Sequence, residues 1–349
     1  MPPPEFPGAN ALSRSLLSLP LVVLTGFLGS GKTTLLNRLL ADPAMHDTAV
    51  IVNEFGEIGV DHLLVSSVAD DVILLASGCV CCSAGEDLGT ALASLLARRS
   101  EGTLPPFQRI ILETTGIAAP ESVLQRLLSD GPVAGQIRIH AVVTVVDAVF
   151  GHSTLSRFTE CASQVAMANR LVVSKLDLVD KAHVDALMEA VRAINPSAPI
   201  ALSARHDAAA ACLFGNSDEG ADVNFQAIPP VSPLSSHRDR AEVHSHRFDT
   251  FWFCWSEATS WGDFKEWLDG LLIARGDSIL RMKGLLQVAG VTHPVVVQGV
   301  QHALYPPGAL ARWPRGTPRS EMVFVTRDFS RDAAVRSFGQ FFPYRVTIA

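Results

Sequence analysis

The segment Gly26–Thr33 constrains the fold of this chain more than any other feature. It reads G-x-x-x-x-G-K-T, the pattern of a phosphate-binding loop, in which glycines allow backbone N–H groups to surround phosphate oxygens. The apolar run Leu21–Leu24 precedes the loop as a buried strand, and leucines at helical spacing follow it. Because both flanks fit a strand–loop–helix unit, the pattern predicts a nucleotide-phosphate site and not a chance match in a glycine-rich turn.

Individual residues of this loop have expected roles. We expect Lys32 to reach the β- and γ-phosphates of a nucleotide and the hydroxyl of Thr33 to ligate Mg²⁺. The start of the following helix adds positive potential at the same place. The other residues expected to bind the phosphates are Gly26, Gly29, Ser30, Gly31 and Thr34.

Length, charge and cysteine content limit the kind of protein this is. The 349 residues are enough for two domains with separate cores. A net charge of −7 argues against a general binder of nucleic acid or anionic membranes, and no apolar run approaches a membrane-spanning length. The six cysteines do not have the spacing of a disulfide framework. We therefore expect a cytoplasmic protein without nucleic-acid or membrane partners.

Residues 20–205 alternate apolar strand runs with helical stretches. Most of the runs are rich in Val, Ile and Leu on both faces, as in strands covered by helices on both sides. This predicts an α/β fold with a mostly parallel sheet. The expected strands are Leu21–Leu24, Ala49–Val52, Val72–Leu75, Arg109–Leu112, Ile139–Val146, Arg170–Val173 and Pro199–Leu202.

The rest of the chain divides into three parts. Residues 1–19 have the composition of a disordered tail, and 206–241 that of a linker. Residues 242–349 predict a smaller α+β domain, in which an extended aromatic stretch precedes a helix capped by Thr259 or Ser260. The aromatic side chains are most simply core. The later elements expected are strands over Ile279–Val288, Val295–Val300 and Met322–Val325 and a helix over Asp332–Phe341.

An acid and a glycine follow the predicted strand Arg109–Leu112. After a phosphate-binding loop, an acid in this position can hold Mg²⁺ through water, which is the role we expect for Glu113. The backbone N–H of Gly116 can then approach the γ-phosphate.

The segment Ser174–Asp177 resembles the guanine-specificity motif of GTPases, in which Asn is usual at its first position. The Asp177 carboxylate can accept two hydrogen bonds from guanine, and adenine offers no such pair. Lys175 would lay its stem on the base, while Ser174 would contact guanine N7 more weakly than Asn does. Ser203 and Ala204 resemble the element whose backbone N–H contacts guanine O6. The motif predicts GTP and GDP as ligands; a solvated ion pair between Lys175 and Asp177 is the alternative.

Three cysteines lie within four positions: Cys79, Cys81 and Cys82. Thiolates suit Zn²⁺, Cu(I), Co²⁺ or Ni²⁺, and three of them leave one position of a tetrahedral site open. Water, Glu57, a histidine or a client protein can fill that position. A redox-active pair and inert buried thiols are the alternatives to a metal site that releases its ion.

These segments occur in an order that resembles a known family, the CobW-like metal-handling GTPases, which are relatives of the UreG and HypB metallochaperones. The residues that carry the resemblance are Gly26–Thr33, Asn53–Asp61, Gly78–Cys82, Glu113–Gly116 and Ser174–Asp177. Gln164–Arg170 and the stretches Gly276–Gly284, Val295–His302 and Met322–Asp328 also look like the family, so the resemblance covers nearly the whole chain.

The resemblance implies a slow, metal-modulated GTPase that binds a transition metal at Cys79, Cys81 and Cys82. Zn²⁺ is expected first and Co²⁺ next, for insertion into an unidentified client metalloprotein. Asn53–Asp61 would be a switch region, in which Glu54 or Asp61 contacts Mg²⁺ or orders the attacking water. Monomer and homodimer both stay open.

Other classes of function compete with this interpretation. A P-loop ATPase or kinase would share the phosphate-binding loop, and a non-catalytic metal sensor would bind metal without useful turnover. A thiol redox protein would use the cysteines differently.

Overall fold

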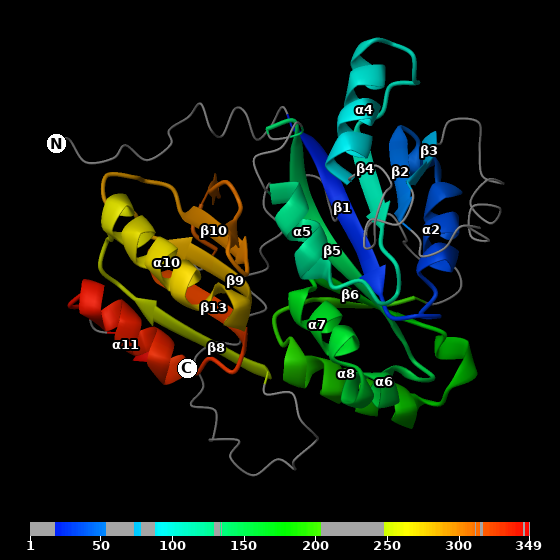
Figure 1. The fold of residues 1–349 in the computed structure, drawn as a ribbon. Helices are drawn as coiled ribbons and strands as arrows, with labels where there is room; N and C mark the ends of the chain where they lie inside the picture. Colours follow the sequence, from blue (N-terminus) through cyan, green and yellow to red (C-terminus); the bar gives the residue numbers. More distant parts are fainter. Residues whose placement is uncertain are drawn as a thin grey trace. The chain divides into compact units, whose positions relative to one another are not determined.

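The computed structural model describes residues 18–53, 73–77, 88–128, 133, 135–203, 248–310, 312–314, 317–344 and 346–348. They divide into two compact units, each built around its own sheet (Figure 1). The predicted tail and linker fall almost entirely outside the described residues, so the domain boundaries stay predictions. Among the described helices, none has both the length and the hydrophobicity needed to cross a membrane.

The amino-terminal unit contains a parallel sheet with helices on both faces, which confirms the predicted fold class. Its seven described strands follow the order β3-β2-β4-β1-β5-β6-β7, and all their pairings are parallel. The strands are β1 (Leu19–Gly26), β2 (Thr48–Asn53), β3 (Ile73–Ser77), β4 (Arg109–Glu113), β5 (Ile137–Asp147), β6 (Arg170–Ser174) and β7 (Ile200–Leu202).

The helices of this unit bury the apolar faces that their sequences predict. In α2, Leu35, Leu36, Leu39 and Leu40 pack with valines of β1, β2 and β5 in one core cluster. The helices and short 3₁₀ turns are α2 (Lys32–Leu40), η1 (Pro43–Met45), α4 (Leu88–Ser100), α5 (Pro120–Leu128), α6 (Gly151–Arg157), α7 (Thr159–Met167), η2 (Leu176–Leu178) and α8 (Lys181–Ile194).

Several strands run further than the sequence predicts, among them β3 and β5. β5 begins at Ile137, two residues before the predicted start, because Arg138 and His140 interrupt the apolar run while the backbone still pairs with β1. β3 continues to Ser77 beyond the predicted end at Leu75, since its register with β2 extends through residues too small or polar to signal a strand. In both cases backbone pairing continues past the apolar signal.

The carboxy-terminal unit belongs to the predicted α+β class, and its described strands pair antiparallel in one sheet that carries the helices α10 and α11. The strand order is β11-β10-β9-β13-β8-β14, with β12 paired to β10. Its elements are β8 (Phe248–Trp255), α10 (Trp261–Arg275), η4 (Gly276–Ser278), β9 (Ile279–Leu286), β10 (Val295–Val300), β11 (Ala303–Leu304), β12 (Gly308–Ala309), β13 (Ser320–Arg327), α11 (Arg331–Phe341) and β14 (Thr347–Ile348).

Aromatic side chains form the core of this unit, which confirms their predicted role. The Trp255 and Phe338 rings have centroids 4.5 Å apart, and Trp267 meets Phe338 edge to face at 5.0 Å.

The structure also decides which residue caps α10. The Ser260 side chain accepts a hydrogen bond from the Asp263 N–H, whereas the buried Thr259 hydroxyl accepts one from Trp255 Nε1 at 2.8 Å.

Candidate nucleotide site

The predicted site residues that the structure describes lie where the parallel strands end. β1 lies between β4 and β5, and β6 pairs with β5, so the carboxyl ends of these four strands share one edge of the sheet. Ligands of open α/β sheets bind at this edge. The chain places the phosphate-binding loop there, between the strands that end in Glu113 and Asp147.

The glycines of the phosphate-binding loop have conformations that other residues avoid. Gly26 has φ 144°, and a Cβ on it would lie 2.3 Å from the Val145 carbonyl oxygen. Gly31 has φ 92° and caps α2, whose first turn contains no acidic residue. The α2 amino terminus therefore retains the positive potential that attracts anions.

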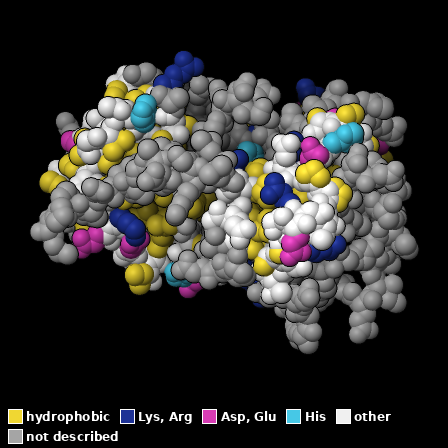
Figure 2. Space-filling model, turned by 90° about the horizontal axis from the view of Figure 1, so that it is seen from above, with side chains coloured by type: hydrophobic (Ala, Val, Ile, Leu, Met, Phe, Trp, Pro, Cys, Tyr) yellow, Lys and Arg dark blue, Asp and Glu magenta, His cyan; other side chains and the backbone are white. Residues whose placement is uncertain are grey.

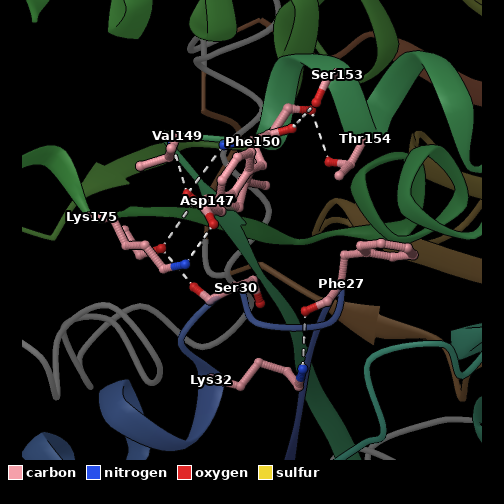
Figure 3. Close-up of polar contacts among 12 residues, drawn as sticks. Phe27, Ser30, Lys32, Asp147, Val149, Phe150, Ser153, Thr154 and Lys175 are labelled. Atoms are coloured by element: carbon pink, nitrogen blue, oxygen red, sulfur yellow. Dashed lines mark hydrogen bonds and ion pairs between the residues drawn. The ribbon is translucent and has the colours of Figure 1, made fainter. Parts of the chain in front are cut away.

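Lys32 is buried within this loop. Its ammonium donates to the carbonyl oxygens of Gly26, at 2.9 Å, and Phe27, at 3.3 Å, and Figure 3 shows the contact with Phe27. Only 8% of the residue is exposed. The loop's own carbonyls thus hold the cation where the sequence predicts contact with phosphates.

Thr33 and Glu113, 80 positions apart in the sequence, come into contact. The Thr33 hydroxyl donates to Glu113 Oε1 at 2.7 Å, and Glu113 is 4% exposed. A hydroxyl and a carboxylate are hard oxygen donors of the kind that Mg²⁺ prefers. These two residues fit the magnesium site that the sequence predicts.

The loop after β4 passes very close to the phosphate-binding loop. A Cβ on Gly116 would lie 2.6 Å from the backbone nitrogen of Leu28 and 2.7 Å from its Cα. Real Cβ atoms do not approach backbone this closely, so the contact requires glycine. The close approach agrees with the predicted position of Gly116 beside the phosphates.

Gly116→Ala is expected to damage the site severely. The added methyl group must displace the Leu28 backbone, and a displacement of this size lowers nucleotide affinity or turnover by about 10-fold or more. Overpacking should also lower the free energy of unfolding by about 1–3 kcal/mol. Fluorescent nucleotide titration and urea denaturation measure the two effects. Gly270→Ala is the control, because no atom lies within 4 Å of its Cβ position in α10; wild-type-like nucleotide affinity in Gly116→Ala contradicts the prediction.

Gln164 supports the same loop and was not predicted as a site residue. It lies fully buried in α7, and its Nε2 donates to the carbonyl oxygens of Gly116 and Ala118, both at 3.1 Å. The sequence marks it only as part of a stretch that resembles the family. A single glutamine within a helix does not reveal which distant loop it will contact.

The start of the predicted guanine motif is tied to the phosphate-binding loop. The Ser174 hydroxyl lies 2.6 Å from the Ser30 carbonyl oxygen and 3.3 Å from that of Val146. Ser174, which stands where Asn is usual, therefore uses its hydroxyl to join β6 to the loop. Lys175 pairs with Asp147 at 2.6 Å, and Asp177 lies exposed in η2. Ser203 follows β7, and its N–H donates to the Val173 carbonyl.

The predicted switch and metal residues lie outside the described residues. These are Glu54, Glu57, Asp61, Cys79, Cys81, Cys82 and, from the guanine site, Ala204. The described strands that precede the switch and cysteine segments end side by side, because Asn53 at the end of β2 pairs with Ser77 at the end of β3. In the part of the chain that the structure describes, no three His, Cys, Asp or Glu residues cluster as metal ligands would.

On the face seen in Figure 2, the charged side chains of the described residues form no cluster of one sign that would indicate a second binding site. There, basic and acidic side chains of the described residues are interspersed, without an extended patch of one sign.

The free cysteines Cys161 and Cys254 are buried, and burial raises the pKa of the Cys161 thiol. Neither thiol has the exposure of a reactive cysteine.

Comparison with known proteins agrees with this geometry. Residues 20–201 match the family described as CobW/HypB/UreG, nucleotide-binding domain, and 248–342 match the cobalamin synthesis protein cobW C-terminal domain. Zinc chaperone YjiA of Escherichia coli is 31% identical over 88% of this chain and 93% of its own length. Zinc chaperone CobW of a Sinorhizobium species is 28% identical over 81% and 85%.

The solved structure of Zn(II)-bound YjiA GTPase from E. coli has the same fold. Its TM-score with this chain is 0.70 at 25% identity, covering 93% of this chain and 99% of that one. The likeness therefore extends over both units.

Proposed function

Because the chain belongs to the CobW/HypB/UreG family, we propose that it is a GTPase that carries zinc and uses GTP hydrolysis to deliver it to a client metalloprotein. The observation that carries the proposal is the convergence of Lys32, Thr33, Glu113 and Gly116 at one sheet edge beside the guanine motif. The relatives described as zinc chaperones support the choice of metal.

For hydrolysis, each described residue has a proposed task. The Lys32 ammonium exchanges loop carbonyls for β- and γ-phosphate oxygens and neutralises their charge. Thr33 and Glu113 would hold Mg²⁺, which supplies further neutralisation of the phosphates. The Gly116 N–H approaches the γ-phosphate, and Glu54 or Asp61 would contact Mg²⁺ or order the attacking water.

Guanine selection falls to Asp177. Its carboxylate accepts from the two N–H groups on guanine. In the element Ser203–Ala204, the N–H proposed to contact O6 is that of Ala204, because the Ser203 N–H donates to the Val173 carbonyl. An ATP molecule in the same site leaves that carboxylate unpaired, which is the physical basis of discrimination. The proposed order of preference is therefore GTP over ATP.

For metal binding, the proposal assigns Cys79, Cys81 and Cys82 to zinc, with cobalt as the next candidate. Support comes from the paired ends of β2 and β3, because the switch segment and the cysteine segment both start at the sheet edge that binds nucleotide. Nucleotide and metal can thus favour one common arrangement of these segments.

The experiment that tests the function measures zinc affinity in two nucleotide states. With a non-hydrolysable GTP analogue, zinc should bind about 5-fold or more tightly than with GDP, because the analogue orders the switch beside the thiolates. GTP and ATP hydrolysis rates are measured on the same preparations. Equal zinc affinities contradict delivery coupled to hydrolysis, and equal use of ATP points to an ATPase.

A further inference from the structure

Asp147 is a buried carboxylate at the sheet edge to which the proposed function gives no role. It is the last residue of β5, and its side chain is 10% exposed. Oδ2 accepts from the Lys175 ammonium at 2.6 Å. Oδ1 accepts from the backbone N–H groups of Val149, at 2.7 Å, and Phe150, at 3.4 Å (Figure 3). The two oxygens thus join the turn before α6 to the guanine motif.

Lys175 has a backbone conformation that needs support. Its φ of 58° and ψ of 32° lie in the left-handed region, which is unfavourable for a residue with a Cβ. This residue lies between the end of β6 at Ser174 and the start of η2 at Leu176, and it is the N-cap of η2, the turn that contains Asp177. The direction in which the turn leaves the sheet therefore depends on Lys175 keeping this conformation.

The turn is held by contacts with Asp147 and Ala148 and by a hydrogen bond within the turn itself. The Ala148 N–H donates to the Ser174 carbonyl at 3.0 Å, and the Leu178 N–H donates to the Lys175 carbonyl at 3.1 Å. The Lys175 side chain is 31% exposed, so the ion pair with Asp147 is partly shielded from water and less screened than a surface pair. The other two contacts join backbone atoms, so the ion pair is the contact among these that a side-chain substitution can remove.

We propose that Asp147 is a positioning residue for guanine recognition: by pairing with Lys175, it holds the turn that presents Asp177 to the base. The inference rests on the proposed GTP specificity of this site. It predicts that Asp147 affects affinity for the base while leaving the phosphate-binding groups in place.

The substitution Asp147→Asn separates the ion pair of this carboxylate with Lys175 from its hydrogen bonds to the backbone. It retains an oxygen that can accept from Val149 and Phe150, and it removes the charge that attracts Lys175. We expect it to weaken binding of fluorescent GDP by about 3- to 10-fold and to raise the KM for GTP more than it lowers kcat. The preference for GTP over ITP, which lacks the 2-amino group, should fall with it.

A double-mutant cycle tests whether Asp147 acts through Lys175. Lys175→Met retains the aliphatic stem without the ammonium, so Asp147→Asn should cause no further loss of GDP affinity in that background. Independent, additive losses would overturn the proposal. The control is Asp42→Asn, because Asp42 Oδ1 likewise accepts from the N–H two residues on, at 2.9 Å, but caps η1 instead.

The outcomes separate the inference from the proposed function. Wild-type protein that binds no guanine nucleotide contradicts the proposed function. Wild-type binding together with unchanged affinity and unchanged GTP-to-ITP preference in Asp147→Asn contradicts only the role of Asp147. A variant that loses thermal stability but no guanine preference shows that the carboxylate is purely structural, which also overturns the inference.

Discussion

Lys32→Ala is expected to lower the rate of GTP hydrolysis by about 100-fold or more. The buried ammonium is the cation placed inside the phosphate-binding loop, and removal of one well-placed charge or donor from a transition state typically costs this much. Single-turnover phosphate release, measured with wild-type and variant protein at saturating GTP, detects the loss.

Lys265→Ala is the matched control for Lys32. Lys265 is an exposed lysine of α10 that pairs with Asp269, and its loss should leave hydrolysis unchanged. If Lys32→Ala hydrolyses GTP at the wild-type rate, the loop is not the hydrolytic site. Full biological function of a Lys32→Ala protein without hydrolysis would favour a metal sensor over a chaperone.

Replacing Cys79, Cys81 and Cys82 together by serine is expected to remove bound zinc almost completely. Serine hydroxyls do not ionise at neutral pH and bind zinc far more weakly than thiolates. The zinc content of purified protein, measured by mass spectrometry, should fall from about one ion per chain to nearly none. The triple substitution removes every proposed thiolate ligand, so no high-affinity zinc site should remain there.

Two cysteines elsewhere in the chain provide the controls. Cys161 and Cys254 are buried in the two separate units, and Cys161→Ala or Cys254→Ala should leave the zinc content unchanged. Zinc retained by the triple variant would move the metal site away from these cysteines. A disulfide that forms in wild-type protein and disappears with Cys79→Ser, at constant metal content, would favour redox chemistry.

Much of the fold could be predicted because its strands are buried on both faces. Continuous apolar runs such as Leu21–Leu24 and Arg170–Val173 mark such strands, and alternation with helices indicates a parallel sheet. The sequence pattern likewise predicted the helices and most of the strands of the carboxy-terminal unit. The predicted ends of several strands were wrong. In β3 and β5, hydrogen bonds to a neighbouring strand extend the element past its apolar residues.

The candidate site could be predicted in part, through local motifs. A phosphate-binding loop depends on glycine conformations and a helix start that adjacent residues determine, and Gly26 and Gly31 have the positive φ angles that it needs. The roles of Glu54, Asp61 and the three cysteines stay predictions, since those residues lie outside the described part of the chain.

The sequence by itself determined which residues suited to phosphate, guanine and soft-metal chemistry the chain contains and in what order they occur; it predicted their roles. Only the tertiary structure decided which side chains from distant segments meet. The hydrogen bonds of Gln164 to the Gly116 loop and the ion pair of Asp147 with Lys175 join residues 48 and 28 positions apart. No local pattern encodes them, because the packing of α7 and the register of β5 with β6 create these contacts.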